Sequence, residues 1–150
     1  MLSEFLQPEK IQFLPRAENW REAIRCAAAP MLQCASLTEG YIEKMIAAVE
    51  EHGPYIVLDA ELALPHARPQ DGALRTDMSM LVLGEAVDML GEPVRVLIAL
   101  SASDNTGHLD AMKALAEFVW AGGSAKSIAA CGSPAAAAAH IKKMSKGEKE

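Results

Sequence analysis

The stretch Tyr55–Pro69 reads YIVLDAELALPHARP and combines two apolar segments with a histidine that lies between two prolines. Its first part, Tyr55–Leu58, is apolar and follows a Gly-Pro pair, which predicts a short buried strand. Proline fixes its own φ angle and biases the preceding residue toward extended backbone, so Pro65 and Pro69 stiffen the chain around His66. We therefore expect His66 on rigid backbone after a strand, which suits a reactive histidine better than a core one.

Length and composition indicate one globular domain. A chain of 150 residues, 51% of them hydrophobic, buries a core without help from a metal or a disulfide. The net charge of −6 argues against nucleic acid as a partner. Cys26, Cys34 and Cys131 form no CxxC pair, which is typical of reduced thiols in the cytosol. We see no signal peptide and no run of roughly 18 apolar residues, and so expect a cytoplasmic protein without direct membrane insertion.

Capping residues and apolar spacing predict the helices. Asn19, with Glu22 in capping-box position, opens the first helix, and Thr38 opens the second. Pro30 removes one backbone hydrogen bond, so we expect a kink or an early end of the helix there. The predicted helices cover residues 19–34, 38–52 and 107–121, and a last helix begins at Ser133-Pro134.

Apolar runs of strand length predict the sheet. Besides Tyr55–Leu58, these runs are Ile11–Leu14, Met78–Leu83 and Val94–Leu100. We expect the last two to be neighbouring strands joined by a loop that includes Val87–Leu90. Strands that alternate with helices indicate an α/β sandwich, with helices packed on a central sheet. We take residues 1–150 as a single domain with a frayed, charged tail at 145–150.

Two of the four histidines stand where a strand gives way to a loop or a helix. Ligands of α/β sheets bind outside the carboxyl ends of the strands, and His66 and His108 are both expected there. A neutral imidazole is a nucleophile near pH 7, which suits phosphoryl transfer. His52, by contrast, is expected only as the basic residue at a helix end, and His140 at the surface.

The segment before His108 predicts an anion site. If Asn105 or Thr106 caps the helix, His108 lies in its first turn, where unpaired N–H groups attract anions. Arg68 lies two residues after His66 and adds a cation. The acids Asp71, Asp104 and Glu61 are interpreted as solvated loop residues without a catalytic role.

The segments GPYIVL, LPHARPQDGALRTDMSMLVL and DNTGH together resemble the enzyme IIA component of the bacterial phosphoenolpyruvate-dependent sugar phosphotransferase system. Within the mannitol–fructose superfamily, the sequence is most similar to the ascorbate type. The resemblance runs from about Trp20 to Trp120 and is densest over Gly53–Leu83. It implies a phosphotransferase with a central mixed β-sheet flanked by helices, and it implies no cofactor and no metal.

The resemblance also assigns roles to individual residues. By motif match, His66 accepts a phosphoryl group from the phosphocarrier protein HPr and passes it to a cysteine of the cognate enzyme IIB, while His108 stabilises the phosphate. We add Arg68, Asn105 and Thr106 as candidate phosphate-binding residues. The mannitol branch carries an arginine in the helix before its active histidine, which this chain lacks, and Arg68 and Arg75 are the nearest cations that could replace it.

Four matters stay open at this point. A regulatory domain of the same fold, whose phosphorylation state controls a partner protein, also needs His66. A metal site made of His66, His108 and an acid is a weaker alternative, because no HxH or HExxH spacing exists. The transported compound, for which ascorbate or a pentitol-like sugar is favoured, and the oligomeric state, with a homodimer as one option, are not encoded in this pattern.

Overall fold

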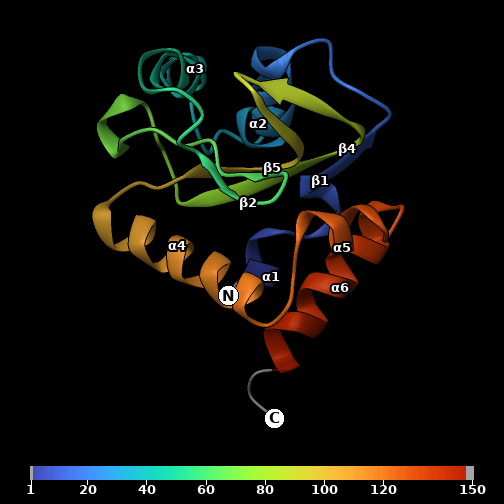
Figure 1. Cartoon of the computed structure of the whole chain (residues 1–150). Helices are drawn as coiled ribbons and strands as arrows, with labels where there is room; N and C mark the ends of the chain where they lie inside the picture. The colour runs from blue at the N-terminus through green and yellow to red at the C-terminus, as the bar shows by residue number, and fades with distance from the viewer. Residues whose placement is uncertain (1, 148–150) are drawn as a thin grey trace.

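A five-stranded mixed sheet forms the middle layer of the molecule (Figure 1). The computed structural model describes residues 2–147, without the side chains of residues 146 and 147. The central strands β4 and β5 are antiparallel, β1 runs parallel to β4, β3 runs parallel to β5, and β2 is antiparallel to β3. The strands, in the spatial order β1-β4-β5-β3-β2, are β1 (Ile11–Leu14), β2 (Val57–Asp59), β3 (Leu62–Ala63), β4 (Asp77–Met89) and β5 (Glu92–Ser101).

Helices cover both faces of this sheet, which confirms the predicted α/β sandwich (Figure 1). One face carries α2 (Trp20–Gln33) and α3 (Glu39–His52). The other carries α1 (Leu2–Phe5), α4 (Asn105–Trp120), α5 (Ala125–Ala129) and α6 (Pro134–Gly147). Two short 3₁₀ helices, η1 (Pro8–Lys10) and η2 (Pro69–Asp71), complete the fold. Helix α6 runs to Gly147, and the remainder of the expected tail, residues 148–150, lies outside the described residues.

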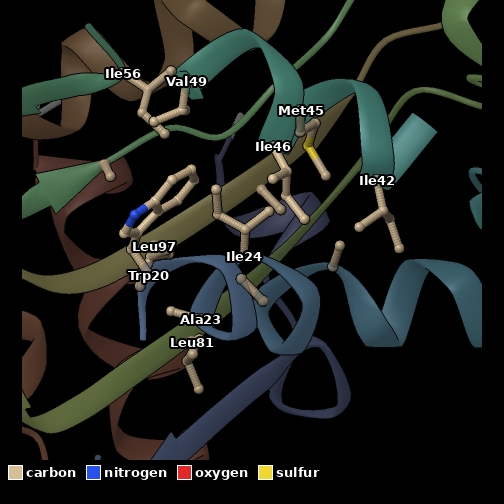
Figure 2. Close-up of a cluster of buried hydrophobic side chains, with 14 of the residues drawn as sticks. Trp20, Ala23, Ile24, Ile42, Met45, Ile46, Val49, Ile56, Leu81 and Leu97 are labelled. Atoms are coloured by element: carbon tan, nitrogen blue, oxygen red, sulfur yellow. The ribbon is translucent and has the colours of Figure 1, made fainter. Parts of the chain in front are cut away.

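The core between the sheet and the α2–α3 layer is built from aliphatic side chains around one tryptophan (Figure 2). Trp20 and Ile24 of α2 face Ile46 and Val49 of α3, and all four are buried. Burying an aliphatic side chain of this size is worth about 1.5–3 kcal/mol relative to exposing it. This packing fixes α3 on the sheet, and α3 in turn supplies one wall of a cleft beside His66.

The predicted starts of α2 and α3 are correct, with one difference in detail. The Asn19 side chain accepts a hydrogen bond from the Glu22 N–H (2.9 Å), and the Thr38 hydroxyl accepts one from the Tyr41 N–H (3.2 Å). The Glu22 carboxylate forms an ion pair with Arg25 (3.2 Å) and does not complete the expected capping box.

The connection between β4 and β5 is a tight hairpin, which corrects the predicted loop. Three of the residues expected in that loop, Val87–Met89, belong to β4, and β5 begins at Glu92. Leu90 and Gly91 form the two-residue turn, with φ angles of 51° and 101°. Asp88 stabilises the turn, because its carboxylate accepts a hydrogen bond from the Gly91 N–H (3.2 Å). Leucine rarely adopts a positive φ angle, so the sequence carries no strong hairpin signal here.

The stretch Tyr55–Leu58 is not the buried strand that we expected. Residues 54–56 form a turn, and the short strand β2 begins at Val57 on the edge of the sheet. Ile56 is buried, while Tyr55 and Leu58 are 44% and 47% exposed. β2 is the edge strand, so no further strand covers its outer side. The apolar side chains of this run can therefore stay partly exposed.

Helix α2 continues through Pro30 to Gln33, and β1 contributes to its stability there. Proline has no N–H, so the Cys26 carbonyl loses the bond that an i→i+4 donor would make. The Gln12 side-chain amide donates to that carbonyl instead (2.7 Å). The Ser79 hydroxyl of β4 donates to the next carbonyl, that of Ala27. The sheet therefore satisfies the carbonyl that Pro30 leaves without a helical donor, and it adds a contact to the next carbonyl.

Because Gln12 supplies the hydrogen-bond donor that Pro30 lacks, the effects of mutating the two residues on stability should be coupled. Gln12→Ala should lower the free energy of unfolding by about 1 kcal/mol, because the Cys26 carbonyl loses its donor. In a Pro30→Ala background the substituted residue regains an N–H that can bond the same carbonyl, and Gln12→Ala should cost less. Denaturant unfolding of the four proteins measures this as a double-mutant cycle. Equal costs of Gln12→Ala in both backgrounds would contradict the assignment.

Candidate functional site

His66 and His108 meet at one end of the sheet. Strands β3 and β5 are parallel, so their carboxyl ends lie at the same edge. The loop after β3 carries His66, and α4, which follows β5, carries His108 in its first turn. The centroids of the two imidazole rings are 5.6 Å apart. The structure thus brings together the two histidines that the sequence singled out.

The backbone on both sides of His66 is held by hydrogen bonds. The Leu100 N–H of β5 donates to the Pro65 carbonyl (2.9 Å). The Ala67 N–H donates to the buried hydroxyl of Tyr41 (3.1 Å), which itself donates to the Leu100 carbonyl (2.8 Å). Helix α3 therefore fixes the histidine loop against β5 through a single phenol group.

This role of Tyr41 was not predicted from the sequence. Its position on the apolar face of α3, beside Ile42 and Met45, gave the available signal. A buried tyrosine hydroxyl needs a hydrogen-bond partner, so a tyrosine among aliphatic core positions indicates a polar contact within the fold.

The imidazole of His66 is held in one tautomer. Its Nδ1 atom lies 2.7 Å from the Leu64 carbonyl oxygen. A carbonyl oxygen only accepts hydrogen bonds, so Nδ1 carries the proton and donates it. In the neutral ring, the lone pair then resides on Nε2. The site consequently presents one defined nucleophilic nitrogen.

Burial keeps this imidazole neutral. The principal effect on the pKa of His66 is desolvation, which lowers it below the ordinary value of 6.5. The bond to the Leu64 carbonyl raises the pKa, and the neighbouring His108 lowers it. Because desolvation dominates, His66 is uncharged near pH 7 and its Nε2 lone pair is available.

An open cleft of about 610 Å³ surrounds the two histidines. Its walls are the outward face of α3, the loop from His66 to Asp71 and the start of α4. In Figure 1 the green loop lies between α3 and the beginning of α4. Of the candidate phosphate-binding residues, Arg68 and Asn105 line this cleft. Thr106 is exposed and is not among the described residues that line it.

The start of α4 differs from the prediction in the identity of its cap. Asp104, and neither Asn105 nor Thr106, is the N-cap, and its carboxylate accepts a hydrogen bond from the Gly107 N–H (2.7 Å). A side chain at Gly107 would meet the Thr76 hydroxyl at 2.5 Å, so glycine permits the close packing that directs this helix start. The Asp104 charge also offsets part of the attraction that the helix terminus has for anions.

His52 and Arg75 have other surroundings than expected. His52 lines the cleft, and its ring contacts Tyr55, whose ring contacts His66, with centroid distances of 5.9 Å in each case. His52 is therefore more than a helix-end residue. Arg75 donates to the Cys34 carbonyl and to the Ser36 hydroxyl (3.0 Å), and it does not line the cleft.

Arg68 is tied to a neighbouring acid. Its Nε atom lies 3.5 Å from the Asp71 carboxylate, which also accepts a hydrogen bond from the Arg68 N–H (3.0 Å). The Asp71 side chain is only 11% exposed, so it is not the solvated acid that we expected. Over the described residues, no group of three or more His, Cys, Asp or Glu side chains is arranged to hold a metal ion. In the same part of the chain, every helix is too short or too polar to span a membrane.

Comparisons with known proteins agree with this architecture. The sequence model of the family described as "Phosphoenolpyruvate-dependent sugar phosphotransferase system, EIIA 2" matches residues 4–144. The mannitol-specific cryptic phosphotransferase enzyme IIA component of Escherichia coli (strain K12) is 37% identical over 120 residues, which cover 79% of this chain and 82% of that protein. The ascorbate-specific PTS system EIIA component of Shigella boydii serotype 4 (strain Sb227) is 31% identical over 103 residues, or 67% of each chain.

A solved structure shows the same fold over nearly the full length. The solution structure of the mannitol-specific cryptic phosphotransferase enzyme IIA from Escherichia coli has a TM-score of 0.84 and 32% identity, and covers 95% of this chain and 98% of that chain. The sandwich fold and the family match define a phosphotransferase component of a sugar transport system. More narrowly, the chain belongs to the enzyme IIA family of the phosphoenolpyruvate-dependent sugar phosphotransferase system.

The lowered pKa predicts how His66 responds to pH. In an NMR titration of the folded protein, the His66 ring should titrate below 6.5, and in denaturant it should return to the ordinary value. The unfolded chain then binds the proton more tightly than the folded one. The contribution of His66 to the free energy of unfolding is therefore fully present above pH ~6.5, and it is lost as the pH falls through the pKa of the folded state.

Replacement of His66 by glutamine supplies the matched comparison. The free energy of unfolding of His66→Gln should fall less than that of the wild type between pH ~7 and pH ~5, because this linkage is removed. A His66 ring that titrates at or above 6.5 in the folded protein would show that desolvation does not control the site.

Proposed function

We propose that this enzyme IIA accepts a phosphoryl group from phospho-HPr on Nε2 of His66 and passes it to a cysteine of a cognate enzyme IIB in the cytoplasm. The observation that carries the proposal is the bond between Nδ1 of His66 and the Leu64 carbonyl (2.7 Å). This bond leaves Nε2 as the free nitrogen of a neutral ring that lines an open cleft. An open cleft suits a relay, because the histidine must meet two protein partners in turn.

The same bond supports both transfer steps. In the first, the Nε2 lone pair forms a bond to phosphorus as the donor's P–N bond breaks and its electron pair returns to the donor nitrogen. The ring of His66 keeps its Nδ1 proton and becomes positively charged, and the Leu64 carbonyl stabilises that charge. In the second, the thiolate sulfur attacks phosphorus, and His66 leaves as a neutral imidazole. A neutral leaving group departs more easily than an imidazolate would.

His108 and the start of α4 supply partners for the phosphoryl oxygens. The His108 ring lies close enough to His66 (5.6 Å between centroids) for one of its N–H groups to reach a phosphoryl oxygen bound there. Asn105 lines the same cleft and lies in the first turn of α4, where N–H groups lack partners within the helix. Arg68 adds a cation that is already shared with Asp71.

The transported compound stays a prediction. The relatives at 37% and 31% identity are named for mannitol and for ascorbate, so the chain resembles enzymes IIA of both kinds. Enzyme IIA contacts HPr and enzyme IIB, whereas the permease binds the sugar. A polyol or ascorbate-like compound is therefore proposed from the relatives alone. A purely regulatory role would use the same histidine, and delivery of the phosphoryl group to an enzyme IIB separates the two.

The experiment follows radiolabelled phosphoenolpyruvate through enzyme I and HPr into the protein. His66→Ala should take up no label, because the nucleophile is gone. His108→Ala should still be labelled on His66, with transfer slowed roughly ten- to a hundred-fold by the loss of one charge-assisted hydrogen bond. His140→Ala serves as the control, since His140 packs against Phe118 and bonds Ser127, away from the cleft.

Two outcomes would contradict this assignment. Label that persists in His66→Ala but disappears in His108→Ala would reverse the roles of the two histidines. Label on wild-type His66 that passes to no enzyme IIB partner, while a bound regulatory target responds to it, would replace transport by regulation.

A further inference from the structure

One face of α3 forms a wall of the cleft that surrounds His66 and His108. This face carries a single cation of the Lys or Arg type. Lys44, Ala47, Ala48, Glu51 and His52 line the cleft, and their three- and four-residue spacing puts them on one side of the helix. Lys44 is the only lysine or arginine in α3. It lies one turn after Tyr41, whose hydroxyl contacts the backbone beside His66.

The other Lys or Arg cation of the cleft already has an acidic partner, and the cleft-lining acid of α3 lies beside a histidine. Arg68 pairs with Asp71 (3.5 Å), and Glu51 lies 3.8 Å from His52. Within residues 2–145, whose side chains are described, Lys44 has no hydrogen bond and no ion pair. The cleft therefore holds one positive charge that no acid of these described residues neutralises.

This distribution contrasts with the arginines of α2. Arg21 pairs with Glu50 (2.9 Å), and Arg25 pairs with Glu43 (2.9 Å), so both are occupied by acids of α3. Lys44, on the cleft side, is left without a carboxylate among the residues whose side chains are described.

A phosphoryl group on His66 would bring the missing counter-charge. It carries a charge of about −1.5 to −2 near pH 7. Ala47 and Ala48 share the cleft face with Lys44, and their short side chains put no bulky group beside the lysine on that face. A lysine ammonium is a compact charge on a four-carbon stem and suits a ligand that arrives and departs.

We propose that Lys44 binds the phosphoryl group carried by His66 and stabilises it during transfer. The proposal rests on the proposed function, since it assumes that His66 is phosphorylated. It assigns to α3 a phosphate-contacting residue that acts from the wall opposite His108. The cleft then holds the phosphoryl group between the start of α4 and the middle of α3.

The test compares Lys44→Gln and Lys44→Arg with the wild type, using two phosphoryl donors. Phospho-HPr is the protein donor, and phosphoramidate is a small donor without a docking surface. With phosphoramidate, Nε2 of His66 forms the new bond to phosphorus, the P–N bond of the donor breaks, and its protonated amine leaves as ammonia. Lys142→Gln is the matched control, because Lys142 is an exposed lysine of α6 in the helix layer on the other face of the sheet.

Lys44→Gln should be phosphorylated about five- to tenfold more slowly by both donors, because one charge-assisted contact to the phosphoryl group is lost. The deficit should shrink as salt rises, since Lys44 is exposed and its field is screened. Lys44→Arg should recover most of the rate, and Lys142→Gln should match the wild type. Circular dichroism should show all variants folded, because Lys44 is exposed and has no hydrogen bond or ion pair among the residues whose side chains are described.

Each other outcome overturns the proposal in a distinct way. Rates of Lys44→Gln equal to wild type with both donors would mean that the lysine is incidental. A deficit with phospho-HPr alone would make Lys44 a docking residue for the carrier protein. Wild-type protein that takes up no phosphoryl group on His66 from either donor would refute the proposed function itself, and Lys44 would lose its ligand with it.

Discussion

The bond between Nδ1 of His66 and the Leu64 carbonyl is the interaction on which the proposed chemistry depends (2.7 Å). The carbonyl can hold that proton only if its own peptide is fixed. The Leu64 N–H donates to the Ile56 carbonyl (2.8 Å), and the next carbonyl, that of Pro65, accepts from Leu100 (2.9 Å). The short strands at the sheet edge thus determine the tautomer, and with burial they determine which nitrogen is free to react in the proposed transfer.

Two other cations of the fold, Lys10 and Arg75, have their partners outside the cleft. Lys10 and the Ser36 hydroxyl bond the buried Asp77 carboxylate (2.7 and 2.6 Å), and these contacts hold the pKa of Asp77 below its ordinary value despite burial. Arg75 bonds the same Ser36. Removing one partner from a buried ionic group is costly, so these cations are committed to stability. A ligand in the cleft can therefore be bound only by cations that do not take part in this hydrogen-bond network.

How far the sequence predicts this structure depends on whether a feature is local. Pro-framed His66 and the histidine in the first turn of α4 were recognisable because their motifs are contiguous. The Asp104 cap was missed, since several adjacent residues could cap that helix. The role of Tyr41 depends on contacts with residues 26 and 59 positions away in the sequence, which periodicity does not encode. The turn at Leu90 has a positive φ angle that the strand pairing on both sides imposes on a leucine.

NMR can determine whether His66 carries the phosphoryl group, as proposed, and on which of its nitrogens. The protein, labelled with ¹⁵N in its histidines, would be phosphorylated through HPr, and coupling to ³¹P would then identify the bonded nitrogen. We predict phosphorus on Nε2 and a proton retained on Nδ1, where the Leu64 carbonyl accepts it. Phosphorus bound to Nδ1 would require that bond to break, and it would contradict the central role of the Leu64 carbonyl in directing the reaction.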